Sequence, residues 1–218
     1  MKNRILTVLM MACFALLVTA APRLGAEDIP ELPMADGSGD TPELELKLAP
    51  PINPATKQDK TLKLSSLRGK VTLLDMFLST CAHCEEHAPH VTEWFNKYKT
   101  RGLQVVGMAR DDERTAASVR SYMTKAKTNY PVGYYSNMVI AYYADSHDHG
   151  VPQMVLFGAD GKMVKRTIGW SEAVGKEMIQ AIEEQLAKSG SATTEPVAPV
   201  KPGSKATAKP ATRKTKVA

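Results

Sequence analysis

The chain has 218 residues, a formal net charge of +5 and three cysteines. Residues 191–218 carry six basic side chains against the single acid Glu195, so this segment alone accounts for the net charge of the whole chain. The basic character therefore belongs to a tail and not to a binding face, which argues against nucleic acid as a partner. Solubilisation, or a loose attraction to anionic envelope surfaces, suffices to explain the tail.

A short apolar segment near the start of the chain follows two basic residues. Lys2 and Arg4 precede the apolar run 5–20, which is shorter than the roughly 18 residues that indicate a membrane-spanning helix. Small residues follow this run, as they do at a cleavage site. We therefore predict a signal peptide over residues 1–20, with an alternative end at residue 26, and export to the periplasm. A lipoprotein anchored through Cys13 and an uncleaved membrane anchor are the two alternatives.

Residues 21–43 are rich in Pro, Gly and Asp and are predicted to form a flexible spacer. If the signal peptide is removed, Cys13 leaves with it, and only two cysteines remain in the mature chain. The protein would then work in an oxidising compartment, and the only disulfide it could form within the mature chain would join these two cysteines.

The two remaining cysteines follow a predicted buried strand. Residues 71–78 form an apolar run interrupted by Asp75, and Cys81-Ala82-His83-Cys84 comes next. A stripe at helical spacing then predicts an amphipathic helix, and its members are Ala88, Val91, Trp94, Phe95 and Tyr98. Cys81 is expected to cap this helix, where unpaired N–H groups and the helix dipole favour the thiolate over the thiol. Cys81 is therefore the predicted nucleophile, and the deeper Cys84 is the predicted resolving thiol.

Two alternatives to a redox pair have less support in the sequence. A structural zinc site would require further cysteines near the motif, and the chain has only Cys13 besides the pair. A disulfide that merely staples the start of the helix would close a very short loop and remove little entropy from the unfolded chain. Asp75 adds weight to a functional site, because a carboxylate in an apolar strand is costly to bury without a partner or a role. An exposed or edge-facing aspartate is the simpler alternative.

The rest of the chain alternates between strands and helices. We predict a peripheral strand within 60–67, a strand at 103–109 and then a helix with a solvated acidic start at Asp111–Glu113. A short strand at 130–135 and a short helix at 138–144 should follow. The last predicted elements are a hairpin of 153–157 and 162–168 and a helix from Ser171 to Lys188. This order predicts an α/β sandwich with a mixed sheet over residues 44–188. Residues 189–218 have no periodic apolar face and are predicted to be disordered.

The strand, the Cys-x-x-Cys pair and the helix with Pro89 resemble the thioredoxin family. Gly150-Val151-Pro152 before a strand is similar to the cis-proline loop of that family, and Asp75 stands where thioredoxins carry a buried aspartate. The leader, the segment Leu64–Lys70 and the long middle insertion resemble the TlpA/ResA group of exported proteins. Thr80 and Ala82-His83 depart from the usual motif, which has a tryptophan before the first cysteine and a proline between the two.

The resemblance implies a fold and a task. The fold is a thioredoxin-like three-layer α/β/α sandwich with a central mixed sheet, in which Val151 and Pro152 face the dithiol and Asp75 exchanges a proton with Cys84. The task is to reduce cysteines of envelope proteins destined for haem attachment or metal ligation. A membrane dithiol donor would recharge the protein.

The predicted activity is thiol-disulfide exchange without a cofactor. The Cys81 thiolate attacks a substrate disulfide, Cys84 then attacks Cys81, and the reduced substrate leaves. His83 is expected to contact the Cys81 thiolate and to make the disulfide more oxidising. The same inner histidine occurs in protein disulfide isomerase and DsbA-type motifs, and Val151 also looks DsbA-like, so both features oppose a reductase role.

Two other functions on the same fold are also considered. A copper- or zinc-binding chaperone would use the five histidines, which lie in the motif helix or in the loop before Pro152, two regions that the fold is expected to bring together. They are His83, His87, His90, His147 and His149. Against this, His87 and His90 would simply lie on the solvated face of the helix. A peroxidase would need an oxidisable pocket around Cys81, for which the sequence has no local signature.

Overall fold

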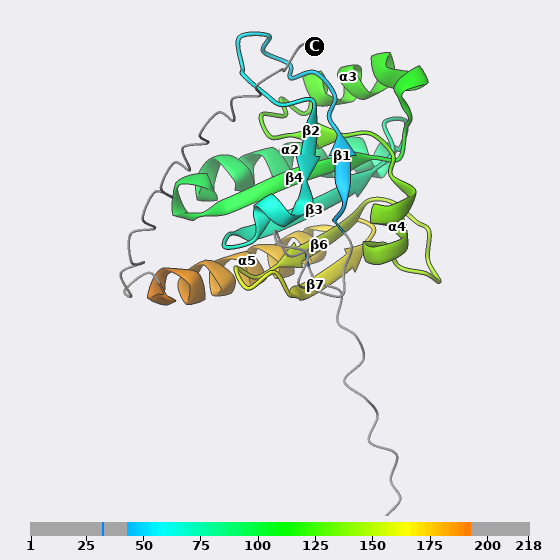
Figure 1. The fold of residues 1–218 in the computed structure, drawn as a ribbon. Helices are drawn as coiled ribbons and strands as arrows, with labels where there is room; N and C mark the ends of the chain where they lie inside the picture. The colour runs from blue at the N-terminus through cyan, green and yellow to red at the C-terminus, as the bar shows by residue number, and fades with distance from the viewer. Residues whose placement is uncertain (1–31, 33–42, 193–218) are drawn as a thin grey trace, which may run out of the picture.

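The computed structural model describes Leu32 and residues 43–192 (Figure 1). The predicted signal peptide, nearly all of the predicted spacer and the residues beyond 192 lie outside the described part of the chain. Among the described residues, no helix combines the length and the apolar character needed to cross a membrane.

Five strands form a central mixed sheet in the order β5-β4-β3-β6-β7. The strands are β3 (Val71–Phe77), β4 (Leu103–Ala109), β5 (Val132–Gly133), β6 (Gln153–Phe157) and β7 (Met163–Ile168). β4 lies parallel to β3 and β5 parallel to β4, whereas β6 is antiparallel to β3 and β7 antiparallel to β6. β3 is buried along its whole length and occupies the centre of the sheet, as its apolar sequence predicts.

Helices cover both faces of this sheet (Figure 1). One core cluster joins the sheet to α2 (Ala82–Tyr98), α3 (Ala116–Lys125) and α5 (Glu172–Ala192). A second cluster joins the opposite face to α4 (Asn137–Tyr143) and to a small two-stranded sheet of β1 (Glu45–Lys47) and β2 (Thr61–Lys63). The predicted three-layer thioredoxin-like architecture is therefore confirmed.

The period of two in β3 decides which layer each side chain enters. Leu73 and Phe77 belong to the cluster under α2, whereas Leu74 and Met76 belong to the cluster under α4. Asp75 alternates in step with Leu73 and Phe77, so the strand directs its carboxylate toward α2 and not toward the α4 side.

The N-terminal part of the domain differs in detail from the prediction. β2 ends at Lys63, and residues 64–67 form the 3₁₀ turn η1 (Leu64–Leu67) instead of continuing the predicted strand. The side chain of Glu43 accepts hydrogen bonds from the Ser65 backbone and hydroxyl, which supports this turn. The segment still covers one edge of the main sheet, as predicted, because Leu48 forms a β-bridge with Gly133.

The C-terminal elements follow the prediction closely. β6 and β7 form the predicted hairpin, with Gly161 in the turn at a φ of 83° that favours glycine. The Ser171 hydroxyl accepts a hydrogen bond from the Val174 N–H, as expected of a helix cap. The prediction ended this helix at Lys188, but α5 continues to Ala192, so the first residues of the predicted disordered tail are helical.

Candidate active site

The two motif cysteines lie where β3 delivers the chain to α2. Cys81 is the N-cap residue of α2, with extended backbone angles of φ −86° and ψ 120°. Its N–H donates to the Leu78 carbonyl, and its own carbonyl accepts the first helical bond from the Glu85 N–H, both at 3.0 Å. Cys81 is partly exposed, whereas Cys84, one turn further, is completely buried. This arrangement matches the predicted roles of an accessible nucleophile and a protected resolving thiol.

A buried carboxylate on the neighbouring strand holds the loop before Cys81. Asp111 follows β4 and accepts hydrogen bonds from the Ser79 N–H at 2.8 Å and from the Ser79 hydroxyl at 2.6 Å. The prediction of a solvated acidic helix start at Asp111 is therefore wrong. Asp112 caps the 3₁₀ turn η3 (Glu113–Thr115), and α3 begins only at Ala116. A loop contact between residues so far apart in the sequence leaves no local signal.

The Gly150-Val151-Pro152 loop faces Cys81 from the other side. The peptide bond between Val151 and Pro152 is cis. The Val151 carbonyl lies 3.7 Å from Cys81 Sγ, within range to accept a hydrogen bond from the thiol. The Arg110 guanidinium donates to the carbonyl of His149 at 2.6 Å and connects this loop to the end of β4. The structure thus places Val151, and with it the start of the cis bond to Pro152, beside Cys81.

Cys84 is held as a neutral thiol. Burial raises the pKa of the Cys84 thiol well above its ordinary value, and a hydrogen bond with Cys81 and the nearby charge of Asp75 raise the pKa further. Deprotonation of Cys84 at neutral pH is therefore unfavourable unless a base close to the thiol takes the proton.

Asp75 and His87 form a buried pair beneath Cys84. Both side chains are completely buried, and His87 Nε2 lies 2.9 Å from Asp75 Oδ1. His87 Nδ1 lies 2.9 Å from the Cys84 carbonyl, so the imidazole connects the carboxylate to the backbone of the resolving cysteine. Burial alone would lower the pKa of His87, but the charge of Asp75 and the hydrogen bonds to Asp75 and Cys84 outweigh burial and raise it.

The simpler alternatives for both residues are wrong. Asp75 is neither exposed nor edge-facing, and His87 does not lie on the solvated face of α2. The sequence analysis considered His87 only as a metal ligand or as part of the solvated helix face, and it missed His87 as the partner of Asp75 because a histidine is polar. Its spacing carried the signal, since Val91, Trp94 and Tyr98 follow His87 at intervals of the buried stripe.

Aromatic side chains lie around Cys84 and the Asp75–His87 pair. Tyr122 on α3 donates its hydroxyl to the Cys84 carbonyl at 2.9 Å, and its ring stacks on Phe77 at 4.1 Å. Burial raises the pKa of Tyr122, so the phenol remains a neutral donor. Trp170, just before α5, lies with its ring centre 5.8 Å from that of His87 and 4.9 Å from that of His90. His87 is thus shielded by Trp170, whereas His90 packs on the same indole from a partly exposed position.

His83 does not take the role expected of it. Its side chain is 75% exposed and points to Glu86, with Nδ1 3.7 Å from the carboxylate. The prediction of a contact between His83 and the Cys81 thiolate therefore has no support in the geometry.

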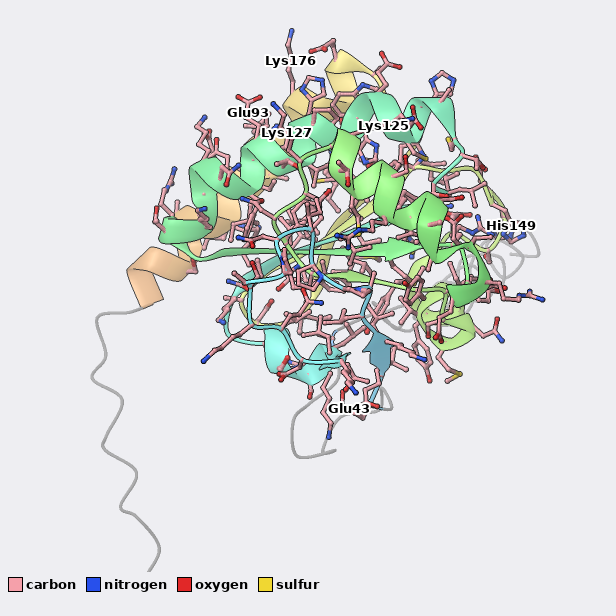
Figure 2. The ribbon with its side chains drawn as sticks, turned by 90° about the horizontal axis from the view of Figure 1, so that it is seen from above. Glu43, Glu93, Lys125, Lys127, His149 and Lys176 are labelled. Atoms are coloured by element: carbon pink, nitrogen blue, oxygen red, sulfur yellow. The ribbon has the colours of Figure 1, made fainter. Side chains whose placement is uncertain are left out.

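The five histidines do not gather into one site. His147 and His149 lie exposed in the loop before Pro152, with His149 at the rim of the molecule (Figure 2). His87 is turned inward to Asp75, and across the described residues no three side chains of the His, Cys, Asp or Glu types are grouped to hold a metal ion. The fold does bring the loop before Pro152 beside the motif helix, as expected, but the described histidines of these two regions do not form a metal-holding group.

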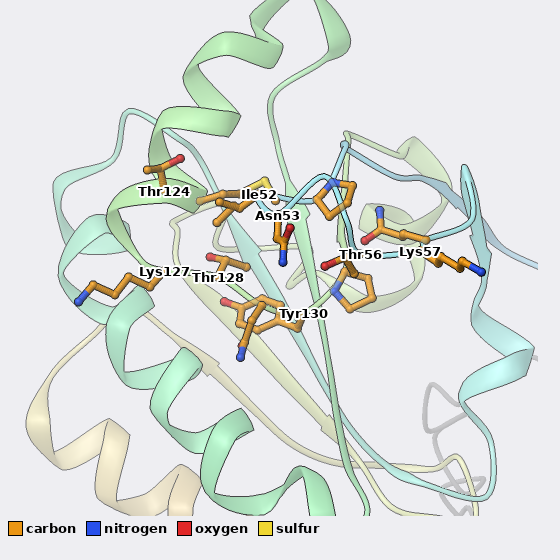
Figure 3. A pocket seen from close by; sticks show the side chains of 13 residues that line it. Ile52, Asn53, Thr56, Lys57, Thr124, Lys127, Thr128 and Tyr130 are labelled. Carbon is orange, nitrogen blue, oxygen red and sulfur yellow. The ribbon is translucent and has the colours of Figure 1, made fainter.

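A cavity of about 430 Å³ lies away from the dithiol. It is lined by residues from within the segments 51–58 and 123–131, and Figure 3 shows Thr128 and Tyr130 among the side chains around it. Neither this cavity nor a smaller one of about 210 Å³ is lined by Cys81, Cys84 or Pro152. The dithiol thus lies outside both of these cavities.

The fold, the capping Cys81 and the buried Cys84 define a thioredoxin-like thiol-disulfide oxidoreductase. A model of the AhpC/TSA family matches residues 40–166. The chain therefore belongs to the AhpC/TSA family.

Known proteins with similar sequences support this class. The thiol-disulfide oxidoreductase ResA of Bacillus anthracis is 27% identical over 124 residues, which cover 56% of this chain and 69% of ResA. Protein DipZ of Mycobacterium bovis is 33% identical over 85 residues, which cover 38% of this chain but only 12% of DipZ. The resemblance to the ResA type that the sequence indicated is confirmed.

A solved structure shows the same fold. The crystal structure of a thiol:disulfide interchange protein of the thioredoxin family from Chlorobium tepidum TLS superposes with a TM-score of 0.55 at 20% identity. The match covers 73% of this chain and 99% of that chain.

Proposed function

We propose that this chain is an exported reductase that keeps cysteines of envelope proteins in the thiol state. The observation that carries the proposal is the partly exposed Cys81 at the N-cap of α2 above the buried Cys84. Such a pair exchanges disulfides through a mixed disulfide on Cys81, which Cys84 then resolves. The apolar leader at residues 5–20 supports export, and cysteines destined for haem attachment or metal ligation are the proposed targets.

The position of His83 supports the reducing direction. A histidine beside the Cys81 thiolate would stabilise the reduced dithiol and make the protein an oxidant. Here the imidazole faces Glu86 and solvent, so that stabilisation is absent from the geometry. A membrane dithiol donor would return the electrons, because redox state in the bacterial periplasm is set by kinetics and not by a buffer.

A trapping experiment tests the proposal. In Cys84→Ser, the mixed disulfide on Cys81 cannot be resolved, so substrates and donor should accumulate as adducts that a reductant cleaves. The double variant Cys81→Ser/Cys84→Ser is the matched control and should trap nothing. Envelope proteins with paired cysteines are the expected partners, and adducts that persist in the double variant, or none at all, would refute the proposal.

The direction of electron flow needs a separate measurement. Rapid acid quenching and thiol alkylation in cells should find the Cys81–Cys84 pair mainly reduced, since a donor keeps a reductase charged. A mainly oxidised pair would indicate an oxidase. Peroxide consumption without reduction of insulin disulfides would instead support the peroxidase alternative.

A further inference from the structure

The buried pair of Asp75 and His87 has a definite proton inventory. His87 Nδ1 faces the Cys84 carbonyl, which can only accept a hydrogen bond, so Nδ1 carries a proton. His87 Nε2 faces Asp75 Oδ1 at 2.9 Å, and a hydrogen bond there requires one proton between the two atoms. The pair is therefore either an imidazolium with a carboxylate or an imidazole with a carboxylic acid, and its net charge is zero in both states.

The groups that surround the pair are neutral. The groups that face it are the thiol and carbonyl of Cys84 from α2, the Tyr122 hydroxyl from α3 and the ring of Trp170 from the segment before α5. The charge of Asp75 also raises the pKa of Tyr130, which lies in the segment before β5. The charge of Asp75 and the hydrogen bonds to Asp75 and Cys84 outweigh burial and raise the pKa of His87, so the imidazolium is the charge that balances the carboxylate.

The second oxygen of Asp75 is an unused acceptor. Asp75 Oδ2 is buried and has no hydrogen-bond partner among the described residues. Buried carboxylate oxygens are normally hydrogen-bonded, so an unpaired one beside a dithiol requires an explanation. Cys84 is the nearby group that must lose a proton for the resolving step, and the charge of Asp75 acts on it.

We propose that His87 is a positioning residue that holds Asp75 through Oδ1 and balances its charge as an imidazolium, so that Asp75 Oδ2 receives the Cys84 proton when the mixed disulfide is resolved. In this step the Cys84 S–H bond breaks and an O–H bond forms on Asp75. The Cys84 thiolate then attacks Cys81 Sγ, the Cys81–Cys84 disulfide forms, and the substrate leaves as a thiolate. Asp75 returns its proton to the leaving thiolate or to solvent, and the imidazolium balances the thiolate charge in between.

This inference rests on thiol-disulfide exchange at Cys81 and Cys84, but not on the identity of the substrate or the direction of electron flow. Ellman's reagent separates the two steps of the exchange in the reduced full chain. Capture of the reagent by Cys81 releases one thionitrobenzoate, and attack by Cys84 releases a second. The rate of the second release therefore measures the resolving step alone.

The variant His87→Gln tests the inference through its pH profile. Glutamine keeps a hydrogen-bond donor but cannot be positive, so nothing would balance the charge of the Cys84 thiolate at neutral pH. The wild-type imidazolium also loses its proton as the pH rises, so the two proteins should then become alike. The second release should be about tenfold slower than in the wild type near pH 6.5, and within about twofold of it near pH 9. His90→Gln is the matched control, because His90 stacks on the same Trp170 from the same helix without touching Asp75.

Two outcomes for His87→Gln overturn the inference. A second release that is slowed equally at every pH would make His87 merely structural, and an unchanged rate would remove His87 from the reaction. Failure of the first release in the wild type would instead refute the proposed function. If His87→Gln does not fold, nitrogen NMR of the wild type decides: protons on both ring nitrogens of His87 at neutral pH support the inference, and a bare Nε2 refutes it.

Discussion

Replacement of Asp111 by alanine should loosen the segment that presents Cys81. The Asp111 carboxylate accepts two hydrogen bonds from Ser79, one from the backbone N–H and one from the hydroxyl, and both residues are buried. A hydrogen bond to a charged group contributes about 1.5–3 kcal/mol, so two of them correspond to at least about 3 kcal/mol. The Ser79 N–H would also remain buried without a partner, which adds to the cost.

Urea unfolding of the oxidised protein, followed by circular dichroism, measures this loss. Asp111→Ala should lower the free energy of unfolding by about 3 kcal/mol or more, with an unchanged dependence on urea. Asp112→Ala is the control on the next residue, because the Asp112 bonds among the described residues are to the exposed Arg114 and within its own turn. The free energy of unfolding should fall much less in Asp112→Ala than in Asp111→Ala. Equal losses in the two variants would show that Asp111 does not anchor the loop before Cys81.

Two further predictions concern stability. The raised pKa of His87 means that the folded protein keeps a proton that the unfolded chain releases, so the free energy of unfolding should fall as pH rises above 6.5. The raised pKa of Cys84 should add a second fall in the free energy of unfolding above pH 9.0, in the reduced protein only, because a disulfide has no thiol to titrate. Urea unfolding of both redox forms across this pH range checks both falls. A free energy of unfolding that stays constant or rises with pH would refute them. Tyr122→Phe keeps the ring on Phe77 but loses the hydrogen bond to Cys84, and should cost about 1 kcal/mol of unfolding free energy in the same assay. No measurable loss would mean that this hydrogen bond does not contribute to stability.

The sequence predicted the frame of the molecule well because its signals are local. The apolar run of β3, the stripe along α2 and the turn at Gly161 each follow from the spacing of neighbouring residues. The capping position of Cys81 follows from the junction of the first two. β5 is shorter than predicted, since only Val132 and Gly133 pair with β4 after Pro131.

The site was predicted only in part because its polar contacts connect distant segments. The period of two in β3 places Asp75 toward α2, but the partner that makes its burial tolerable is His87, which the sequence suggests only as a metal ligand or as part of the solvated helix face. Asp111 likewise reads as a helix start until the end of β4 is placed beside Ser79. For His83 the sequence predicted a contact that the structure does not have. Its place between the two cysteines suggested a contact with the Cys81 thiolate, whereas its side chain points to Glu86.

The rate of alkylation of each cysteine tests the central claim, that Cys81 is the nucleophile and Cys84 the protected resolving thiol. The reduced protein is treated with iodoacetamide at neutral pH, and the label on each cysteine is followed by mass spectrometry. Cys81 should react at least about tenfold faster than Cys84, because it is partly exposed at the helix N-terminus while Cys84 is buried with a raised pKa. The two rates should converge in urea, where the fold no longer separates the thiols. Equal rates in the folded protein, or faster labelling of Cys84, would contradict the account.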